Sequence, residues 1–577
     1  MTAPQIGIFV LIGAMLIGFG FGRVRYEVVA LSGLAAGVLL GFVPSHTVFQ
    51  GFSSPTVITV IEILLIVEAL RGSHLVGMAA GAIPWLGSDR RRIVVATCAI
   101  AALLSAFMNN IGALALMMPL ATAMCERYRI SLRDMLMPLS FATLLGGLCT
   151  IVGTPANLIG SDFLSGMRGY PLGFFELLAV GLPLTLAGLA YIYVITPGAS
   201  PDESAGTDGD DLRVLVREAV VPAGSALAGR SIGDIRAGED ITIHNIVRTG
   251  RFVFGDQGRI VAAGDLLVLT ATRSVIRKSF TSRLLDRPDG RQAHPEYRYM
   301  EAVVLPDSIY VGSPVENLFL SAAGGVGVEA LGITPRRIEG RLADVRLAVG
   351  DVVALRGDIR VMDAECAESG LLKLADVADA PHPEKGDFIP LGAFVLAIAA
   401  AAFGGIDPAL AFGAVVVVLA LTGNLSIRRG LEGMPWPSIV MLASMIPLGL
   451  AVATTGAAAA LADLVLQVVP AASGFALSAF MLMLAVLLTP FVNNPSTVIV
   501  LAPIGAAVAE RYGLSAQPVI IAIIVGASLD FMAPFGHHNN TLVMGVAGYS
   551  FRDFLRIGAP LVGLSVLVTL ACLHLYF

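Results

Sequence analysis

Long apolar segments separated by short polar breaks make up most of this chain. Six lie before residue 199 and six lie after residue 387, near 6–22, 28–44, 57–70, 93–124, 135–166 and 174–196, and near 388–403, 408–422, 438–454, 475–508, 518–546 and 559–577. A helix needs about 20 apolar residues to cross about 30 Å of hydrocarbon, and several segments are shorter than that. The repetition nevertheless predicts an α-helical polytopic membrane protein.

Composition agrees with the membrane prediction. Of 577 residues, 56% are hydrophobic and 14% are charged, whereas about a quarter of the residues of a soluble domain are charged. All lysines lie within 200–387, which is therefore a polar block between two apolar halves. The net charge of -6 is not clustered, so nucleic acid is not an expected partner. The cysteines have no spacing typical of zinc sites or disulfides.

The two apolar halves are related by an internal repeat. The first half contains Asn109-Asn110, Pro119, Glu126-Arg127-Tyr128 and Ser131, and at one offset the second half contains Asn493-Asn494, Pro503, Glu510-Arg511-Tyr512 and Ser515. After a one-residue deletion, Gly153 and Asn157 match Gly536 and Asn540. Duplicated halves of this length are typical of secondary transporters. We therefore expect membrane repeats at 1–198 and 388–577.

Paired asparagines interrupt one long apolar segment in each half. Asn109-Asn110 and Asn493-Asn494 lie in mid-segment, the latter between Pro490 and Pro495. Irregular backbone at membrane depth requires protein or a water-filled cavity around it. This predicts re-entrant hairpins at about 93–124 and 475–508. The alternative is a pair of kinked spans joined by Asn–Asn hydrogen bonds.

Arginine placement predicts the orientation of the chain. With one re-entrant hairpin, each half crosses the membrane five times, and an odd number inverts the second half. Most arginine-bearing breaks then face the cytoplasm together with residues 199–387, as the positive-inside rule requires. We expect a multi-pass protein of the inner (plasma) membrane, with both termini outside, lipid around it, and a first apolar segment that is a retained span.

A second kind of break follows each hairpin. Residues 153–157 read Gly-Thr-Pro-Ala-Asn, and residues 534–540 read Pro-Phe-Gly-His-His-Asn-Asn. A broken helix presents free N–H groups to an anion on one side and free C=O groups to a cation on the other. Two tips and two breaks at the midplane are therefore suited to bind both kinds of ion.

These tips and breaks resemble the divalent anion/sodium symporter family of the ion transporter superfamily. The family tip motif is Ser-Asn-Thr, and the corresponding positions here read Asn109-Asn110-Ile111 and Asn493-Asn494-Pro495. The resemblance implies a mobile transport domain, a dimerising scaffold, elevator-type movement, and symport of sodium with sulfate or a dicarboxylate. It implies a homodimer and no organic cofactor. No enzyme activity is expected.

The same resemblance assigns site residues. One sodium site would consist of Ser105, Asn109, Asn110 and the Gly153 carbonyl, and the other of Thr489, the Val492 carbonyl, Asn494 and the Gly536 carbonyl. The anion would be bound by Asn109, Asn110, Thr154, Asn493, Asn494 and His537. Because the tip hydroxyls of the family motif are absent, amides and imidazoles remain as donors, and sulfate fits these as well as a dicarboxylate does.

Three ionisable residues near the second break are candidates for coupling. An ionisable group inside a membrane segment is a functional hypothesis by default. His537 could donate to an anion, and Asp530 and His538 could couple cations or protons. The structural alternative is a neutral histidine bonded to the backbone and an aspartate paired with a nearby donor. Proton-coupled anion transport is therefore the alternative mechanism.

The polar block predicts an inserted α+β region of two small domains, at 212–282 and 298–376, with a linker at 377–387. Both copies carry a Pro, Ser and Gly motif, and then a Gly-Asp turn before an apolar run at Gly264-Asp265 and Gly350-Asp351. The pattern resembles the C-terminal domain of regulators of potassium conductance (TrkA-C or RCK-C), which implies regulation by a nucleotide-type ligand. The alternative is a purely structural or dimerising module.

Two other functional classes fit less well. A ligand-gated ion channel could use the same loop domains, but the chain contains no pore-filter motif such as TVGYG. A membrane-bound enzyme needs a nucleophile–base pair or a metal cluster, and no HExxH motif or carboxylate pair stands out.

Overall fold

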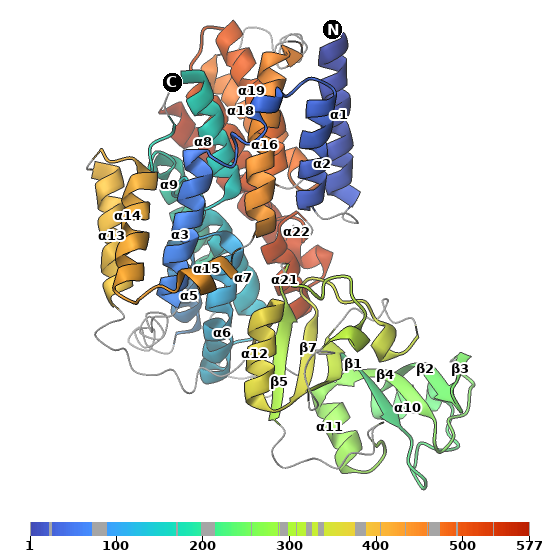
Figure 1. Cartoon of the computed structure of the whole chain (residues 1–577). Coiled ribbons are helices and arrows are strands. Elements are labelled where there is room, and N and C mark those ends of the chain that lie inside the picture. The colour runs from blue at the N-terminus through green and yellow to red at the C-terminus, as the bar shows by residue number, and fades with distance from the viewer. Residues whose placement is uncertain are drawn as a thin grey trace.

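The computed structural model divides into a helical part and a smaller part with a β-sheet (Figure 1). The two chain ends lie at the end of the helical part that is remote from the sheet. The structure describes residues 2–21, 26–71, 89–168, 171–197, 214–254, 257–286, 288, 298–306, 308–318, 326–332, 340–374, 388–403, 405–432, 434, 436–457, 460, 473–491, 494–534 and 536–575.

The first half of the helical part contains most of the apolar segments expected from the sequence. Its helices are α1 Ala3–Phe21, α2 Tyr26–Leu39, α3 Pro55–Arg71, α5 Arg90–Ser105, α6 Asn110–Tyr128, α7 Leu132–Gly146, α8 Pro155–Arg168 and α9 Leu178–Ile195. The helix boundaries at Ser105–Asn110 and Gly146–Pro155 coincide with the hairpin tip and the break that the sequence predicts.

The second half repeats this order after the insert. Its helices are α13 Phe388–Phe403, α14 Pro408–Leu421, α15 Ile427–Glu432, α16 Trp436–Thr454, α18 Gly474–Leu488, α19 Asn494–Arg511, α20 Ala516–Ser528, α21 His538–Ala547 and α22 Phe551–His574. The packing partners are exchanged between the halves: α3 contacts α14 while α16 contacts α2, and α8 contacts α19 while α21 contacts α6. The helical prediction is confirmed, and the inversion of the halves across a membrane stays a prediction.

Among the described helices, two are long and apolar enough to cross a membrane alone. They are Leu178–Ile195 and Phe551–His574, and eight shorter apolar stretches of 10–17 residues lie in other helices. Some helices are short because one apolar segment of the sequence is divided between two helices, as with α7 and α8 or α20 and α21. A broken pair can still cover the roughly 30 Å of hydrocarbon as one unit.

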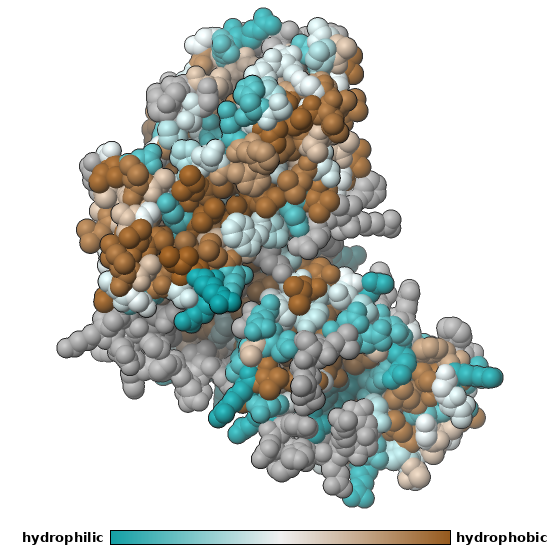
Figure 2. Space-filling model, in the orientation of Figure 1, coloured by the Kyte–Doolittle hydropathy of each residue, from teal (hydrophilic) through white to brown (hydrophobic). Residues whose placement is uncertain are grey.

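The surface of the helical part is apolar over a broad band, whereas the part with the sheet is largely hydrophilic (Figure 2). Large apolar side chains that are exposed include those of Val10, Val194, Leu396, Leu410, Leu421 and Leu567. Soluble monomers rarely expose contiguous apolar patches of this extent. The band is therefore suited to contact lipid.

The insert forms one antiparallel sheet flanked by short helices. Its elements are β1 Val214–Val220, α10 Ile232–Glu239, β2 Thr242–Arg248, β3 Arg251–Phe254, β4 Leu266–Thr272, α11 Arg273–Thr281, β5 Arg298–Val304, β6 Gly327–Gly332, β7 Val352–Gly357, α12 Ile359–Ser369 and β8 Leu371–Lys373. The strand order is β3-β2-β4-β1-β6-β7-β5-β8. Strands β1-β4-β2 and β5-β7-β6 have matching connections, and β1 joins β6 at the Val216–Leu331 pair.

The two Gly-Asp turns make equivalent hydrogen bonds in the two copies. Gly264 N donates to Val221 O at 2.8 Å, and Gly350 N donates to Val304 O at 2.9 Å. Each turn therefore ties the start of its last long strand, β4 or β7, to the end of its first strand, β1 or β5. Glycine is required because both turn glycines have φ near +86° to +87°.

The second copy packs directly on the helical part. Its residues Val303, Val352 and Leu374 belong to the same buried apolar cluster as the helices, and Thr122 Oγ1 of α6 donates to Leu374 O at 2.9 Å. The Gly350 turn lies against α21, since a Cβ at Gly350 would come within 2.7 Å of Thr541 O. The insert thus contacts α6 and α21, the helices that begin at the first hairpin tip and at the second break.

A candidate site for an anion and two cations

The two hairpin tips have the same internal geometry. Ser105 Oγ donates to Asn110 Oδ1 at 2.8 Å, and Thr489 Oγ1 lies 3.0 Å from Asn494 Oδ1. All four side chains are buried. Each tip therefore gathers a hydroxyl oxygen and a carboxamide oxygen where a helix begins, and hard monovalent cations prefer such oxygen ligands.

The two breaks are also built alike. Asn157 Nδ2 donates to the carbonyls of Gly147 and Thr150, both at 2.8 Å. Asn540 Nδ2 donates to the carbonyls of Asp530 and Ala533, at 2.7 and 3.1 Å. These bonds satisfy carbonyls that the broken helices leave without partners. Asn157 and Asn540 thus stabilise the broken backbone of the two halves.

Four helix N-termini meet at one cavity of about 160 Å³. The first residues of α6, α8, α19 and α21, which are Asn110, Pro155, Asn494 and His538, all line it. Helix N-termini carry a partial positive charge and unpaired N–H groups, so they attract anions. Neither arginine nor lysine is among the described residues that line the cavity, so the helix dipoles would be the source of any attraction for an anion there.

His537 and Asn110 provide donors from opposite halves of the chain. Nδ1 of His537 accepts a hydrogen bond from Asn539 N at 3.1 Å, so the proton of a neutral imidazole is on Nε2. His537 Nε2 lies 3.5 Å from Asn110 Nδ2. Two N–H donors this close are suited to share one acceptor, and an anionic oxygen in the cavity would be such an acceptor.

Asp530 lies behind the second break and is 1% exposed. Among the described residues, neither oxygen of its carboxylate has a hydrogen-bond partner. The carboxylate packs against Gly536, where any Cβ would overlap it. Gly536 itself lines the cavity. The carboxylate is therefore one residue away from the cavity.

The cavity brings together most of the residues that the sequence predicts for the site. Its lining includes Asn109, Asn110, Thr154, Asn494, Gly536, His537 and His538. Ser105 and Thr489 lie directly behind it through their bonds to Asn110 and Asn494. The predicted ligands Val492 and Asn493 lie outside the described residues.

Two of the predicted anion ligands are also helix caps. Asn109 Oδ1 accepts from Gly112 N at 2.8 Å, and Thr154 Oγ1 donates to Asn157 Oδ1 at 2.9 Å. Capping fixes each side chain at the start of its helix. Asn109 retains its Nδ2 donors for an anion, whereas the Thr154 hydroxyl proton is already engaged.

Sequence reasoning missed three contributors to the site. Asn539 Nδ2 donates to Asn110 O at 3.0 Å and to Thr143 Oγ1 at 2.8 Å, and so ties the second break to the first tip. Pro306 of the insert lines the cavity, as do apolar residues of α3 and α16 such as Ile63 and Leu442. The asparagine doublet was a visible signal for Asn539, but the tertiary contacts of Pro306 leave no local pattern.

A family model that matches most of the chain shows which family the protein belongs to. The model, described as citrate transporter, matches residues 14–489 and 471–577. The chain belongs to the citrate transporter family. This confirms the prediction of a membrane transporter. The prediction that the insert is related to regulators of potassium conductance stays a prediction.

Similar proteins agree with membership of the citrate transporter family. An uncharacterized transporter of Synechocystis, sll0640, is 27% identical over 92% of this chain and 90% of its own length. The uncharacterized transporter YfbS of Escherichia coli is 25% identical over 99% of this chain and 98% of its own length. Sodium/sulfate cotransporter 1 of Chlamydomonas reinhardtii is 26% identical over 44% of this chain and 32% of its own length.

Proposed function

We propose that this member of the citrate transporter family is a secondary active transporter that carries a small divalent anion together with sodium ions. The observation that carries the proposal is the convergence of four helix N-termini on one cavity. Because no lysine or arginine is among its described lining residues, the charge of a bound dianion needs further compensation. Co-bound cations beside the same cavity would supply it.

Sulfate is the substrate that the donor set fits best. The cavity offers amide and imidazole N–H groups and helix N-termini, and a compact tetrahedral dianion accepts hydrogen bonds in all directions. A relative is described as a sodium/sulfate cotransporter. Dicarboxylates and citrate are the competing substrates.

Sodium would bind at the two tips. Ser105 and Asn110 with the Gly153 carbonyl form the first proposed site, and Thr489 and Asn494 with the Gly536 carbonyl form the second. The oxygen-only ligand sets suit a hard cation. The alternative is proton-coupled transport, in which His537 and Asp530 carry the protons. This alternative predicts transport that does not depend on sodium.

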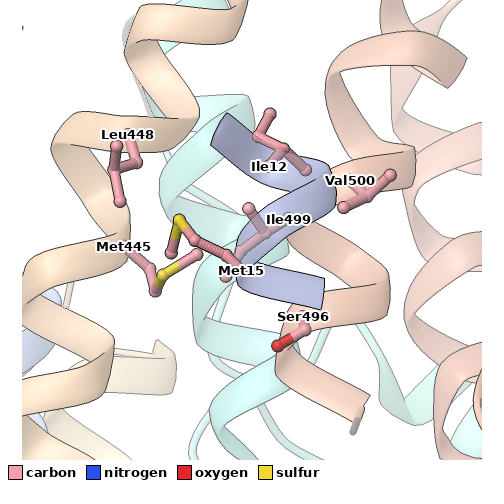
Figure 3. A pocket seen from close by; sticks show the side chains of 7 residues that line it. All are labelled: Ile12, Met15, Met445, Leu448, Ser496, Ile499 and Val500. Carbon is pink, nitrogen blue, oxygen red and sulfur yellow. The ribbon is translucent and has the colours of Figure 1, made fainter. Parts of the chain in front are cut away.

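Elevator movement would carry the hairpins α5–α6 and α18–α19 past a scaffold that includes α1 and α16 and forms a homodimer. Figure 3 supports this division, because the gap between α1, α16 and α19 is lined by apolar side chains and one serine. Met15 and Met445 point into it. Flexible methionine side chains tolerate altered packing, which suits a surface that slides.

The insert would lie in the cytoplasm and regulate transport. Its Gly350 turn contacts α21, and Leu374 is bonded to α6. A nucleotide-type ligand that shifts the second copy would therefore act on both helices that begin at the site.

Uptake into proteoliposomes tests the proposed function. Labelled sulfate, succinate and citrate are each offered with and without an inward sodium gradient, to the wild type and to a protein with both Asn110→Ala and Asn494→Ala. We expect sodium-dependent sulfate uptake that the double variant lacks. Uptake that follows a proton gradient and does not depend on sodium would mean that protons are the coupling ion. Uptake of citrate alone would mean that citrate, and not sulfate, is the substrate.

A further inference from the structure

The two proposed cation sites differ in one residue that the internal repeat makes visible. The bonds of Asn157 to the carbonyls of Gly147 and Thr150 match those of Asn540 to the carbonyls of Asp530 and Ala533. Gly147 and Asp530 are therefore equivalent backbone positions. The first half has no side chain where the second half has a carboxylate.

The backbone geometry of the first half shows where a side chain at this position points. A Cβ at Gly147 would overlap Asn110 Oδ1 of the first tip. Asn494 is the residue of the second half that corresponds to Asn110, and it accepts from Thr489 as Asn110 accepts from Ser105. Because Asp530 is equivalent to Gly147, its side chain points toward Asn494 at the second tip.

Two observations on Asp530 itself support that direction. Its carboxylate packs against Gly536, the residue whose carbonyl completes the second proposed site. Thr489 Oγ1, another proposed ligand of that site, also lies 2.6 Å from Ala527 O, three residues before Asp530 in the chain. The buried carboxylate has no hydrogen-bond partner among the described residues, and burying an unpaired charge is costly unless a cation compensates it.

We propose that the Asp530 carboxylate is a direct ligand of the second cation site, so that this site binds one monovalent cation as a neutral pair while the first site uses uncharged oxygens only. The inference rests on the proposed sodium coupling and adds a charged ligand to it. Before the cation binds, the carboxylate repels an anion from the adjacent cavity, and afterwards it does not. Cation binding would thus precede anion binding at this site.

Sodium binding to the purified full-length protein without anion tests the ligand role directly. Equilibrium binding of labelled sodium is compared for the wild type, Asp530→Asn and Asp530→Glu. Removing a full charge from a cation site weakens sodium binding by about tenfold or more. We therefore expect Asp530→Asn to lose sodium binding at the second site and Asp530→Glu to retain part of it. Superimposable isotherms for the wild type and Asp530→Asn would overturn the proposal.

Glu62→Gln is the matched control. This carboxylate is on α3, where a Cβ at Gly413 of α14 would lie 2.7 Å from it, and Glu62 does not line the cavity. The same carboxylate-to-amide change there should leave sodium binding unaltered. Asn110→Ala, in the first site, should leave the Asp530-dependent component in place.

Thermal unfolding separates a ligand from a merely structural aspartate. Sodium should raise the Tm of the wild type more than that of Asp530→Asn, and in sodium-free buffer Asp530→Asn should unfold at the same or a higher temperature than the wild type. A lower Tm in both buffers would overturn the proposal in favour of a structural role. Sodium-dependent sulfate uptake by the wild type with unaltered sodium binding by Asp530→Asn would refute this inference alone, whereas a wild type that binds no sodium would refute the proposed function as well.

Discussion

Nε2 of His537 lies 3.5 Å from Nδ2 of Asn110, although 427 residues separate them in the chain. The imidazole comes from the break in the second half, and the carboxamide comes from the hairpin tip in the first. Because Nδ1 of His537 already accepts from Asn539 N, both facing groups are N–H donors. This pair joins the two halves at the point where an anion would accept from both.

Removing the imidazole donor should weaken anion binding. We expect His537→Ala to raise the KM for sulfate by about tenfold or more, the usual cost of losing a hydrogen bond to a charged group, with a smaller change in sodium dependence. His46→Ala serves as the control, because His46 lies in the short helix Ser45–Thr47 and does not line the cavity. Initial uptake rates over a range of sulfate concentrations provide the measurement, and equal KM values for both variants would contradict the role of His537.

The asparagines of the two breaks should matter for stability rather than for affinity. Asn157→Ala and Asn540→Ala each leave two buried carbonyls without their partner, at a cost of about 1–3 kcal/mol per unsatisfied group. We expect a lower Tm for either variant in detergent and similar losses in both halves. Asn424→Ala is the matched control, since the Asn424 side chain bonds to Thr422 at an exposed site. A Tm equal to that of the control would mean that water replaces these bonds.

The contact between the insert and α21 should control the transport rate. A Cβ at Gly545 would overlap the Gly350 carbonyl, so Gly545→Ala pushes the turn away from the helix. We expect a changed maximal rate of sulfate uptake with little change in KM, because the cavity residues stay in place. Gly563→Ala on α22 is the control, since no atom lies within 4 Å of a Cβ there. An unaltered rate for Gly545→Ala would count against regulation through this turn.

How far the sequence alone predicts this arrangement depends on the range of each interaction. The doublet Asn109-Asn110 was recognisable because polar residues interrupt an apolar run, and Asn157 because its neighbours form a Gly-Thr-Pro break. The family resemblance placed His537 and Asn110 at one anion site, but the 3.5 Å between their nitrogens depends on tertiary packing, which no local pattern in the sequence shows. The packing of the Gly350 turn on α21 likewise depends on how two folded parts meet.

An acidic residue of the insert should give it a pH-dependent stability. Burial alone would raise the pKa of Asp265, but hydrogen bonds from Arg248 and the Ala262 N–H, with the Arg248 charge, lower that pKa below its ordinary value. A lowered pKa stabilises the folded form above the unfolded value of about 3.9, and this contribution is lost as the pH falls through the folded pKa. We expect Asp265→Asn to increase hydrogen exchange of β2 and β4 at neutral pH and to have a smaller effect at pH 3, which lies below the unfolded pKa, measured on the full-length protein. An equal effect at both pH values would contradict this linkage.

The apolar gap between α1, α16 and α19 allows a test of movement. A flexible cross-link between Met445→Cys and Ile499→Cys, which line the same gap (Figure 3), should abolish sulfate uptake and leave sodium binding intact. Each single cysteine variant treated with the same reagent should remain active. Full activity of the cross-linked protein would contradict movement of α19 past α16.

The central claim is that a sodium gradient drives a divalent anion through the cavity at the four helix N-termini. Its most direct test is accumulation of labelled sulfate in liposomes that contain the wild-type protein and are diluted into sodium-rich buffer at equal sulfate concentration on both sides. We predict a transient internal sulfate concentration above the external one, which disappears when an ionophore collapses the sodium gradient. Sulfate that only equilibrates, or that accumulates equally without sodium, would contradict the account.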